Sequence, residues 1–144
     1  MLRISRIYDD VLPVNQEKLR QVKEILRSRF SSVAEEEIET LGEKLRNPFK
    51  QRFCSILFVA ESMRGKVLGF ATLLHEPEIG FAYLDWIAIA TDRSGGGLGG
   101  ALYERVRYEA ASLKVKGLFF ECLPDEEKDC PDKVILKENR SRLR

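Results

Sequence analysis

The chain has 144 residues, of which 24 are basic and 23 acidic, and 44% of its residues are hydrophobic. This profile predicts one globular domain over residues 1–144, long enough to bury a core. A net charge of +1 leaves no basic surface for a phosphate backbone, so no nucleic-acid partner is expected. No apolar run could span a bilayer or serve as a signal peptide, which favours a cytoplasmic protein without a membrane partner.

The cysteines predict neither a disulfide framework nor a metal site. Cys54, Cys122 and Cys130 form no C-x-x-C pair, and the chain has one histidine, His75. Cys54 and Cys122 belong to expected strands, and no histidine accompanies either in the sequence. We therefore expect both to be core residues and not nucleophiles, with His75 in a turn or on the surface.

The first third of the chain predicts a strand followed by two helices. The strand covers residues 2–7, and the first helix follows Asn15 as a candidate N-cap. The second helix follows a capping box at Ser32 and Glu35 and ends at Pro48. The apolar stripes are Leu19, Val22, Ile25 and Leu26 in the first helix and Ile38, Leu41 and Leu45 in the second.

Three strands, a helix and a fourth strand are expected next. Residues 53–61 and 67–74 flank a short turn and predict an antiparallel hairpin, and residues 81–90 predict a third strand. Residues 118–123 predict another core strand after the helix. The fold class is therefore α/β. The buried stripe of the helix consists of Leu98, Leu102, Val106, Ala110 and Leu113.

A run of glycines separates the third of these strands from the helix. Five glycines occupy the six positions 95–100. Such a run lets the backbone turn sharply and direct N–H groups at an anion beside the positive end of the helix dipole. A plain tight turn does not need five glycines, each of which costs roughly 0.5–1 kcal/mol where alanine would do. The run therefore predicts a phosphate-binding loop.

The segment 81–106, FAYLDWIAIATDRSGGGLGGALYERV, resembles the acetyl-coenzyme A (acetyl-CoA) signature of the GNAT superfamily of N-acetyltransferases. In that signature an apolar strand leads to an Arg/Gln-x-x-Gly-x-Gly loop and a helix. Gly97 and Gly99 align with the paired glycines, Ser94 replaces the usual Arg or Gln, and Arg93 lies one position earlier. The resemblance implies a GNAT-like mixed, largely antiparallel sheet flanked by helices, and acetyl-CoA as a co-substrate without a metal.

The same resemblance assigns the residues that hold acetyl-CoA. Backbone amides of the strand pair with the pantetheine arm, and the loop and helix start bind the pyrophosphate. These residues are Ile87, Ala88 and Ile89 in the strand, Arg93, Ser94, Gly95, Gly96 and Gly97 in the loop, and Leu98, Gly99 and Gly100 at the helix start.

A competing pattern is a dinucleotide-binding fingerprint. Gly95, Gly97 and Gly100 spell G-x-G-x-x-G, and Glu121 follows about 20 residues later, where a ribose-binding acid would lie. The strands before the glycines are joined by short turns and are expected to be antiparallel, whereas that fold needs a parallel sheet with long crossovers. The sequence therefore favours the acetyl-CoA signature over the dinucleotide-binding fingerprint.

Acetyl transfer to an amine requires a proton acceptor, because a lysine-type amine has a pKa of about 10.4. Strand alternation predicts that Tyr83 and Asp85 share a face with Ile87 and Ile89. Tyr83 occupies the position of the catalytic glutamate in the histone-acetylating branch of the superfamily, which argues against that branch. Asp85 is a candidate base. Either residue could instead be a strand residue satisfied by a neighbouring hydrogen bond.

Two further polar residues are candidates near the end of the chain. Glu121 closes an apolar strand, so it could have a raised pKa and act as a general base, or it could form a structural salt bridge. Asn139 resembles the asparagine of the family's Asn-x-x-Ala-x-x-aromatic-Tyr motif, which approaches the pantetheine. Arg142 replaces the small residue of that motif, and no tyrosine follows it in this sequence.

These features predict an N-acetyltransferase in which a primary amine, not identified by the sequence, attacks acetyl-CoA directly in a ternary complex. The alternative is a non-catalytic acyl-CoA-sensing module, which would account for Ser94 and for the lack of the tyrosine. The family's two closing strands are not found. We therefore expect either a further C-terminal region of a longer chain or a second copy, as in a homodimer, to cover the sheet edge.

Overall fold

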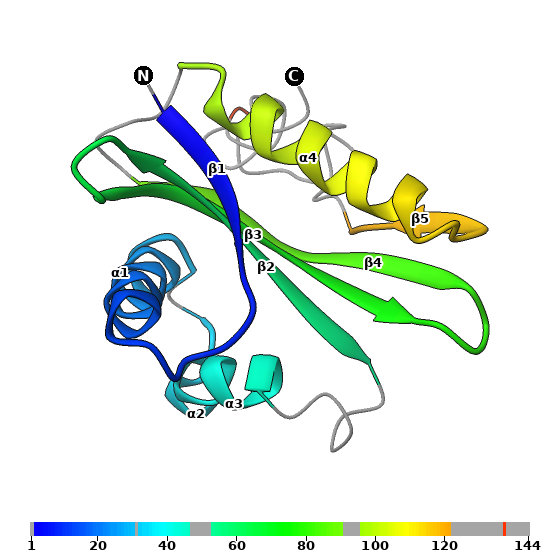
Figure 1. Cartoon of the computed structure of the whole chain (residues 1–144), viewed down its shortest axis with the longest axis horizontal. Helices are drawn as coiled ribbons and strands as arrows, with labels where there is room; N and C mark the ends of the chain where they lie inside the picture. Colours follow the sequence, from blue (N-terminus) through cyan, green and yellow to red (C-terminus); the bar gives the residue numbers. More distant parts are fainter. Residues whose placement is uncertain (1, 31, 47–52, 91–95, 122–136, 138–144) are drawn as a thin grey trace.

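The computed structural model describes residues 2–30, 32–46, 53–90, 96–121 and 137. Helices cover both faces of a twisted sheet, with α1, α2 and α3 on one face and α4 on the other (Figure 1). The elements are β1 (Leu2–Ile7), α1 (Pro13–Arg29), α2 (Glu35–Glu39), α3 (Leu41–Arg46), β2 (Cys54–Ser62), β3 (Val67–Glu76), β4 (Phe81–Ile89), α4 (Leu98–Ser112) and β5 (Gly117–Phe119).

The sheet has the order β1-β2-β3-β4-β5, and its first three pairings are antiparallel. The pairing of β4 with β5 is parallel, and α4 forms the crossover between them. This topology confirms the expected mixed, largely antiparallel sheet. It rules out the dinucleotide-binding fold, because the strands that precede the glycine run are antiparallel hairpins.

The first helix begins earlier than expected, so the assignment of Asn15 as its N-cap is wrong. The N-cap is Leu12, and α1 starts at Pro13. Proline suits the first helical position because its fixed φ is already helical and its missing N–H needs no partner. The polar atoms nearby serve the preceding loop, where Asp9 Oδ1 accepts bonds from the Val11 N–H at 3.0 Å and from Asn15 Nδ2 at 3.4 Å.

The second expected helix is two short helices, α2 and α3, separated at Thr40. The predicted capping box is also wrong, since the N-cap is Ala34 and no side chain caps the helix. Ser32 lies before the helix, and the Glu35 carboxylate accepts hydrogen bonds from Arg27 of α1 instead. The predicted apolar positions are nevertheless buried: Ile38, Leu41 and Leu45.

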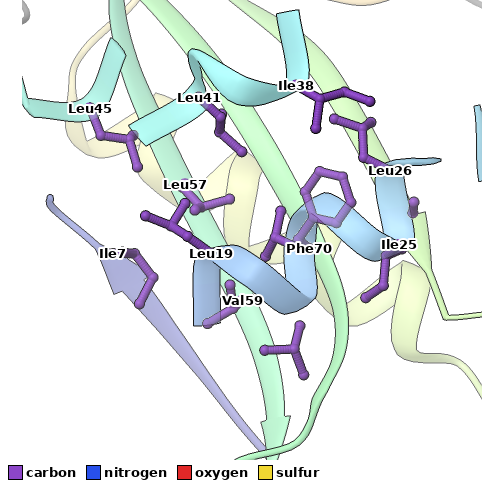
Figure 2. Packing of buried hydrophobic residues seen from close by; sticks show 13 residues of the cluster. Ile7, Leu19, Ile25, Leu26, Ile38, Leu41, Leu45, Leu57, Val59 and Phe70 are labelled. Atoms are coloured by element: carbon purple, nitrogen blue, oxygen red, sulfur yellow. The ribbon is translucent and has the colours of Figure 1, made fainter. Parts of the chain in front are cut away.

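Two hydrophobic clusters hold the layers together, one on each face of the sheet. Beneath α1–α3, side chains of the helices point at Leu57, Val59 and Phe70 of the sheet (Figure 2). Beneath α4, Leu102 and Val106 are fully buried against β2, β3 and β4. Burial of each such side chain contributes about 1.5–3 kcal/mol, so the two clusters fix which face each helix covers.

The last strand is shorter than the expected 118–123. β5 covers Gly117–Phe119, and Phe120 and Glu121 follow it outside the strand. The rest of that range and the expected terminal helix with Asn139 lie outside the described residues. In the described part of the sheet β5 is an edge strand, so coverage of this edge by another segment or copy stays a prediction.

Candidate active site

A β-bulge interrupts β4 at Asp85. Thr72 of β3 lies opposite Trp86 and the next residue, Leu73, lies opposite Leu84, so Asp85 is the extra residue on β4. The Trp86 N–H donates a hydrogen bond to the Thr72 hydroxyl oxygen at 3.0 Å. The bulge therefore turns one residue of β4 out of the regular alternation.

The bulge overturns the expectation that Tyr83 and Asp85 share a face with Ile87 and Ile89. Ile87 and Ile89 pack with the cluster beneath α4, whereas Asp85 lines a hollow beneath α1–α3. Tyr83 precedes the bulge, and its neighbour Leu84 packs beneath α4, so alternation directs Tyr83 to the face of Asp85. The prediction failed because strict alternation assumes a continuous register.

Asp85 lies in a hollow of about 20 Å³, room for roughly one water molecule. Apolar side chains of α1, α3 and the sheet form most of its wall, together with the charged groups of Glu37 and Lys44. Burial raises the pKa of Asp85 above its ordinary value; the positive charge of Lys44 opposes this rise and the negative charge of Glu37 adds to it. The carboxylate is therefore more basic than a solvated aspartate.

Tyr83 and Glu121 complete a group of three candidate residues. Burial raises the pKa of the Tyr83 phenol, and the charge of Glu121, a hydrogen bond to it and the charge of Asp85 raise it further. Tyr83 thus keeps its proton at neutral pH, and its hydroxyl donates a hydrogen bond to the Glu121 carboxylate. Glu121 is exposed, so the apolar surroundings expected for it are not found.

Among the described residues, the edge of β4 beside the bulge has no neighbouring strand, and we call it the open edge. β5 pairs only with residues 81–83, and no described strand pairs with β4 beyond them on this side. The N–H groups of Trp86 and Ala90 donate toward β3, so alternation directs the amides of Ile87 and Ile89 to the open edge. Of the three strand residues assigned to pantetheine, these two face the gap, and the Ala88 amide is directed toward β3.

The start of α4 lies at the same end of β4. Gly97 is the N-cap with φ +76°, a left-handed conformation that favours glycine, and no side chain caps the helix. A Cβ built at Gly96, Gly97 or Gly100 would meet no atom of the described residues within 4 Å, so packing against that part of the chain does not require these glycines. The uncapped N–H groups and the uncovered backbone fit the pyrophosphate of acetyl-CoA.

Four of the residues predicted to bind acetyl-CoA lie outside the described part of the chain. They are Arg93, Ser94 and Gly95 in the loop, and Asn139 near the end. Leu98 and Gly99 belong to the first turn of α4, where Leu98 is buried against the sheet and holds the helix start in place. A Cβ built at Gly99 would lie 3.9 Å from the Ile89 side chain, so the described part of the glycine run lies beside the end of β4.

The structure brings together one pair that the sequence did not suggest. Cys54 at the start of β2 lies opposite His75 on β3, although 20 positions separate them along the chain. Alternation places this pair on the α4 face, because the next pair inward, Ile56 and Leu73, is buried there. β3 lies between Cys54 on β2 and the open edge of β4.

The described ranges show neither a cluster of metal ligands nor a membrane-spanning helix. No group of three or more His, Cys, Asp or Glu side chains there could hold a metal ion. None of the helices in those ranges is both long and apolar enough to cross a membrane.

Comparison with known proteins identifies the family. The model of the acetyltransferase (GNAT) family matches residues 19–131. Tetrahymena GCN5 superposes with a TM-score of 0.71 at 16% identity, over 95% of this chain and 77% of that chain. An aminoglycoside acetyltransferase from an uncultured soil metagenomic sample, in complex with sisomicin, superposes with a TM-score of 0.68 at 22% identity, over 98% and 86%.

A GNAT family acetyltransferase from Brucella melitensis, in complex with acetyl-CoA, has a TM-score of 0.63 at 18% identity, over 89% of this chain and 80% of that one. A search of curated protein sequences finds no match. The structural matches share the fold, and the family model covers most of the chain, including both sides of the glycine run. The chain therefore belongs to the GNAT family and is an acetyl-CoA-dependent N-acetyltransferase.

Proposed function

We propose that the chain transfers the acetyl group to a primary amine by direct attack within a ternary complex, with Asp85 as the proton acceptor. The observation that carries the proposal is the bulge of β4. It places Asp85 on the α1–α3 face while the amides of Ile87 and Ile89 remain on the open edge. The proposed base, Asp85, and the two backbone donors, Ile87 and Ile89, therefore lie within five residues of one another on the same strand.

Acetyl-CoA, when bound, would supply the acetyl group, and CoA would leave as the free thiol with the proton that the attacking nitrogen loses as the C–N bond replaces the C–S bond. The N–H groups of Ile87 and Ile89 are available to donate to the pantetheine arm and to the thioester oxygen as it gains charge. The attacking amine must lose its ammonium proton first, and Asp85 is the group that accepts it, directly or through a water in the hollow. The raised pKa of Asp85 improves this proton transfer.

Tyr83 has a different role in this scheme. Because the Tyr83 hydroxyl donates its hydrogen bond to Glu121, its oxygen is left to accept a hydrogen bond from the incoming amine. Tyr83 would then orient the amine, and Glu121 would orient Tyr83. Neither residue needs to change its protonation state during the transfer.

The first experiment tests the acetyl-CoA site. Acetyl-CoA should raise the thermal midpoint, since a ligand that binds only the folded state stabilises it by RT ln(1 + [L]/Kd), whereas NAD should not. Gly97→Val should abolish the shift, because a branched side chain at positive φ distorts the helix start that faces the phosphates. A shift with NAD and none with acetyl-CoA would overturn the proposal.

The second experiment tests transfer. Release of free thiol in the presence of a panel of small amines, aminoglycosides and peptides should identify an acceptor. Binding of acetyl-CoA with no thiol release across the panel would favour the sensing module instead.

A further inference from the structure

Thr72 is a buried polar residue that the proposed chemistry does not use. It lies in the middle of β3 and is 3% exposed. Its hydroxyl oxygen accepts the hydrogen bond of the Trp86 N–H at 3.0 Å, and the register of β3 with β4 shifts directly after it. The contact therefore lies at the point where the strand changes alternation.

The hydroxyl supplies the Trp86 N–H with a side-chain acceptor at the bulge. In a regular antiparallel ladder an N–H of this kind donates to a carbonyl of the facing strand, and a bulge disrupts that arrangement locally. A buried N–H without a partner is costly, so an acceptor at the bulge stabilises it. Thr72 provides this acceptor from its own side chain.

Trp86 also contacts a neighbouring helix end through its ring. The Trp86 ring lies against the Phe30 ring, with centroids 4.7 Å apart, and Phe30 is the C-cap of α1. The position of the Trp86 backbone thus connects the bulge to the helix that borders the hollow. A shift of Trp86 would therefore disturb both the bulge and the packing against the end of α1.

We propose that Thr72 is a positioning residue for acetyl transfer. Its hydroxyl stabilises the bulge that directs Asp85 and Tyr83 to the α1–α3 face while the amides of Ile87 and Ile89 stay on the open edge. This inference rests on the proposed function, in which Asp85 accepts the proton.

The test compares Thr72→Val, which keeps the shape but removes the hydroxyl, with Thr72→Ser, which keeps the hydroxyl. We expect kcat to fall about tenfold or more in Thr72→Val and to stay within about threefold of wild type in Thr72→Ser. The thermal shift by acetyl-CoA should remain in both, because the phosphate-binding turn at Gly97 lies beyond β4. A loss of turnover without a loss of cofactor binding separates positioning from general damage to the fold.

Two spectroscopic measurements report the bulge itself. The chain has a single tryptophan, so its fluorescence reports Trp86 alone. Thr72→Val should change this emission and accelerate hydrogen exchange of the Trp86 amide, and Thr72→Ser should leave both near wild type. If Thr72→Val keeps the wild-type exchange rate or the wild-type kcat, or if Thr72→Ser loses as much turnover, the proposal is wrong.

Asp85→Asn distinguishes failure of this inference from failure of the proposed base. If Thr72 acts through Asp85, adding Thr72→Val to Asp85→Asn should reduce turnover by less than about twofold further. Full turnover in Asp85→Asn alone would reject Asp85 as the base. Exchange of the Trp86 amide does not depend on which residue takes the proton, so it would still show whether Thr72 holds the bulge.

Discussion

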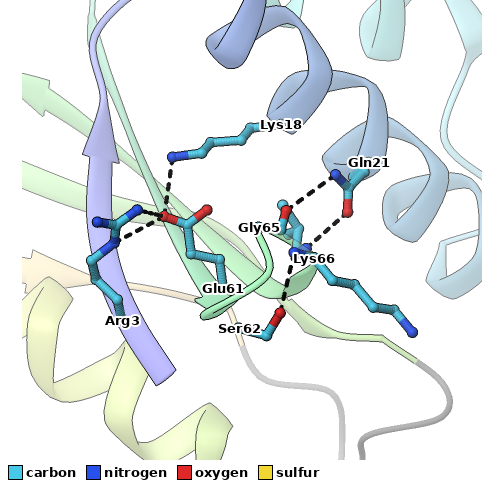
Figure 3. Close-up of polar contacts among 8 residues, drawn as sticks. Arg3, Lys18, Gln21, Glu61, Ser62, Gly65 and Lys66 are labelled. Atoms are coloured by element: carbon cyan, nitrogen blue, oxygen red, sulfur yellow. Dashed lines mark hydrogen bonds and ion pairs between the residues drawn. The ribbon is translucent and has the colours of Figure 1, made fainter. Parts of the chain in front are cut away.

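Two carboxylates on the α1–α3 face of the sheet have opposite environments. Glu61 on β2 is 1% exposed, and one of its oxygens accepts bonds from Arg3 Nε at 3.0 Å, Arg3 Nη2 at 2.5 Å and Lys18 Nζ at 3.0 Å (Figure 3). Burial by itself raises the pKa of Glu61, but the hydrogen bonds and charges of Arg3 and Lys18 outweigh it and leave the pKa below its ordinary value. Asp85 is shifted the other way, because burial and Glu37 outweigh Lys44.

The difference shows what each carboxylate can do. Glu61 ties β1 and α1 to the end of β2, and its charge is too well stabilised to take up a proton near neutral pH. No hydrogen bond contributes to the pKa shift of Asp85, so its charge is less well compensated and its affinity for a proton is higher. Burial acts on both carboxylates and does not distinguish them. The charged side chains near each carboxylate do.

The largest expected effect is on turnover. Asp85→Asn should lower kcat by about 10²–10⁴-fold, the usual contribution of a general base, while binding of acetyl-CoA is retained. Glu61→Gln is the matched control, a buried carboxylate on the same face, and should change kcat by less than about threefold in steady-state assays. Equal losses in the two variants would remove the functional distinction between the two sites.

The next effect is on stability. Glu61→Gln should lower the free energy of unfolding by about 2 kcal/mol, because it weakens charge-assisted bonds and leaves the Lys18 ammonium half-buried with a neutral partner. Glu104→Gln removes an exposed ion pair with Arg107 and should cost less than about 0.5 kcal/mol. Urea denaturation measures both. A loss at Glu61 no greater than at Glu104 would show that the Glu61 cluster is not structural.

The smallest effect is the pH dependence, which should have opposite signs at the two sites. The lowered pKa of Glu61 means that its contribution to stability is present above the unfolded value near 4.5 and is lost as the pH falls through the lower folded pKa. The raised pKa of Asp85 means that the folded state binds its proton more tightly than the unfolded state does. Ionised Asp85 therefore costs stability at neutral pH.

It follows that Asp85→Asn should be more stable than wild type at pH 7, and that this advantage should shrink as the pH falls toward 3.8. The advantage of wild type over Glu61→Gln should shrink below pH 4.5. Thermal or urea unfolding at a series of pH values checks both trends. A stability gain at neutral pH with a loss of turnover would show that Asp85 is retained for chemistry at a cost to the fold.

Local sequence patterns determined much of this protein. The buried stripes of α1 and α4 were predicted correctly except for Leu113, which is the half-buried C-cap of α4, because one face of a helix repeats at a spacing that the sequence itself displays. The glycine run at 95–100 identified the turn before α4, since a left-handed N-cap such as Gly97 strongly favours glycine. The motif around it was sufficient to predict the GNAT family.

Only the tertiary structure decided which way the candidate residues face. The helix starts at Pro13 and Glu35 were missed because Asn15 bonds to Asp9 and Glu35 bonds to Arg27 of α1, and neither side chain caps a helix. The pairing of Cys54 with His75, and above all the bulge at Asp85, depend on how separate strands align. The Thr72 hydroxyl on β3 accepts a hydrogen bond at the bulge and so favours the extra residue on β4. The alternation of residues along β4 gives no information about this partner.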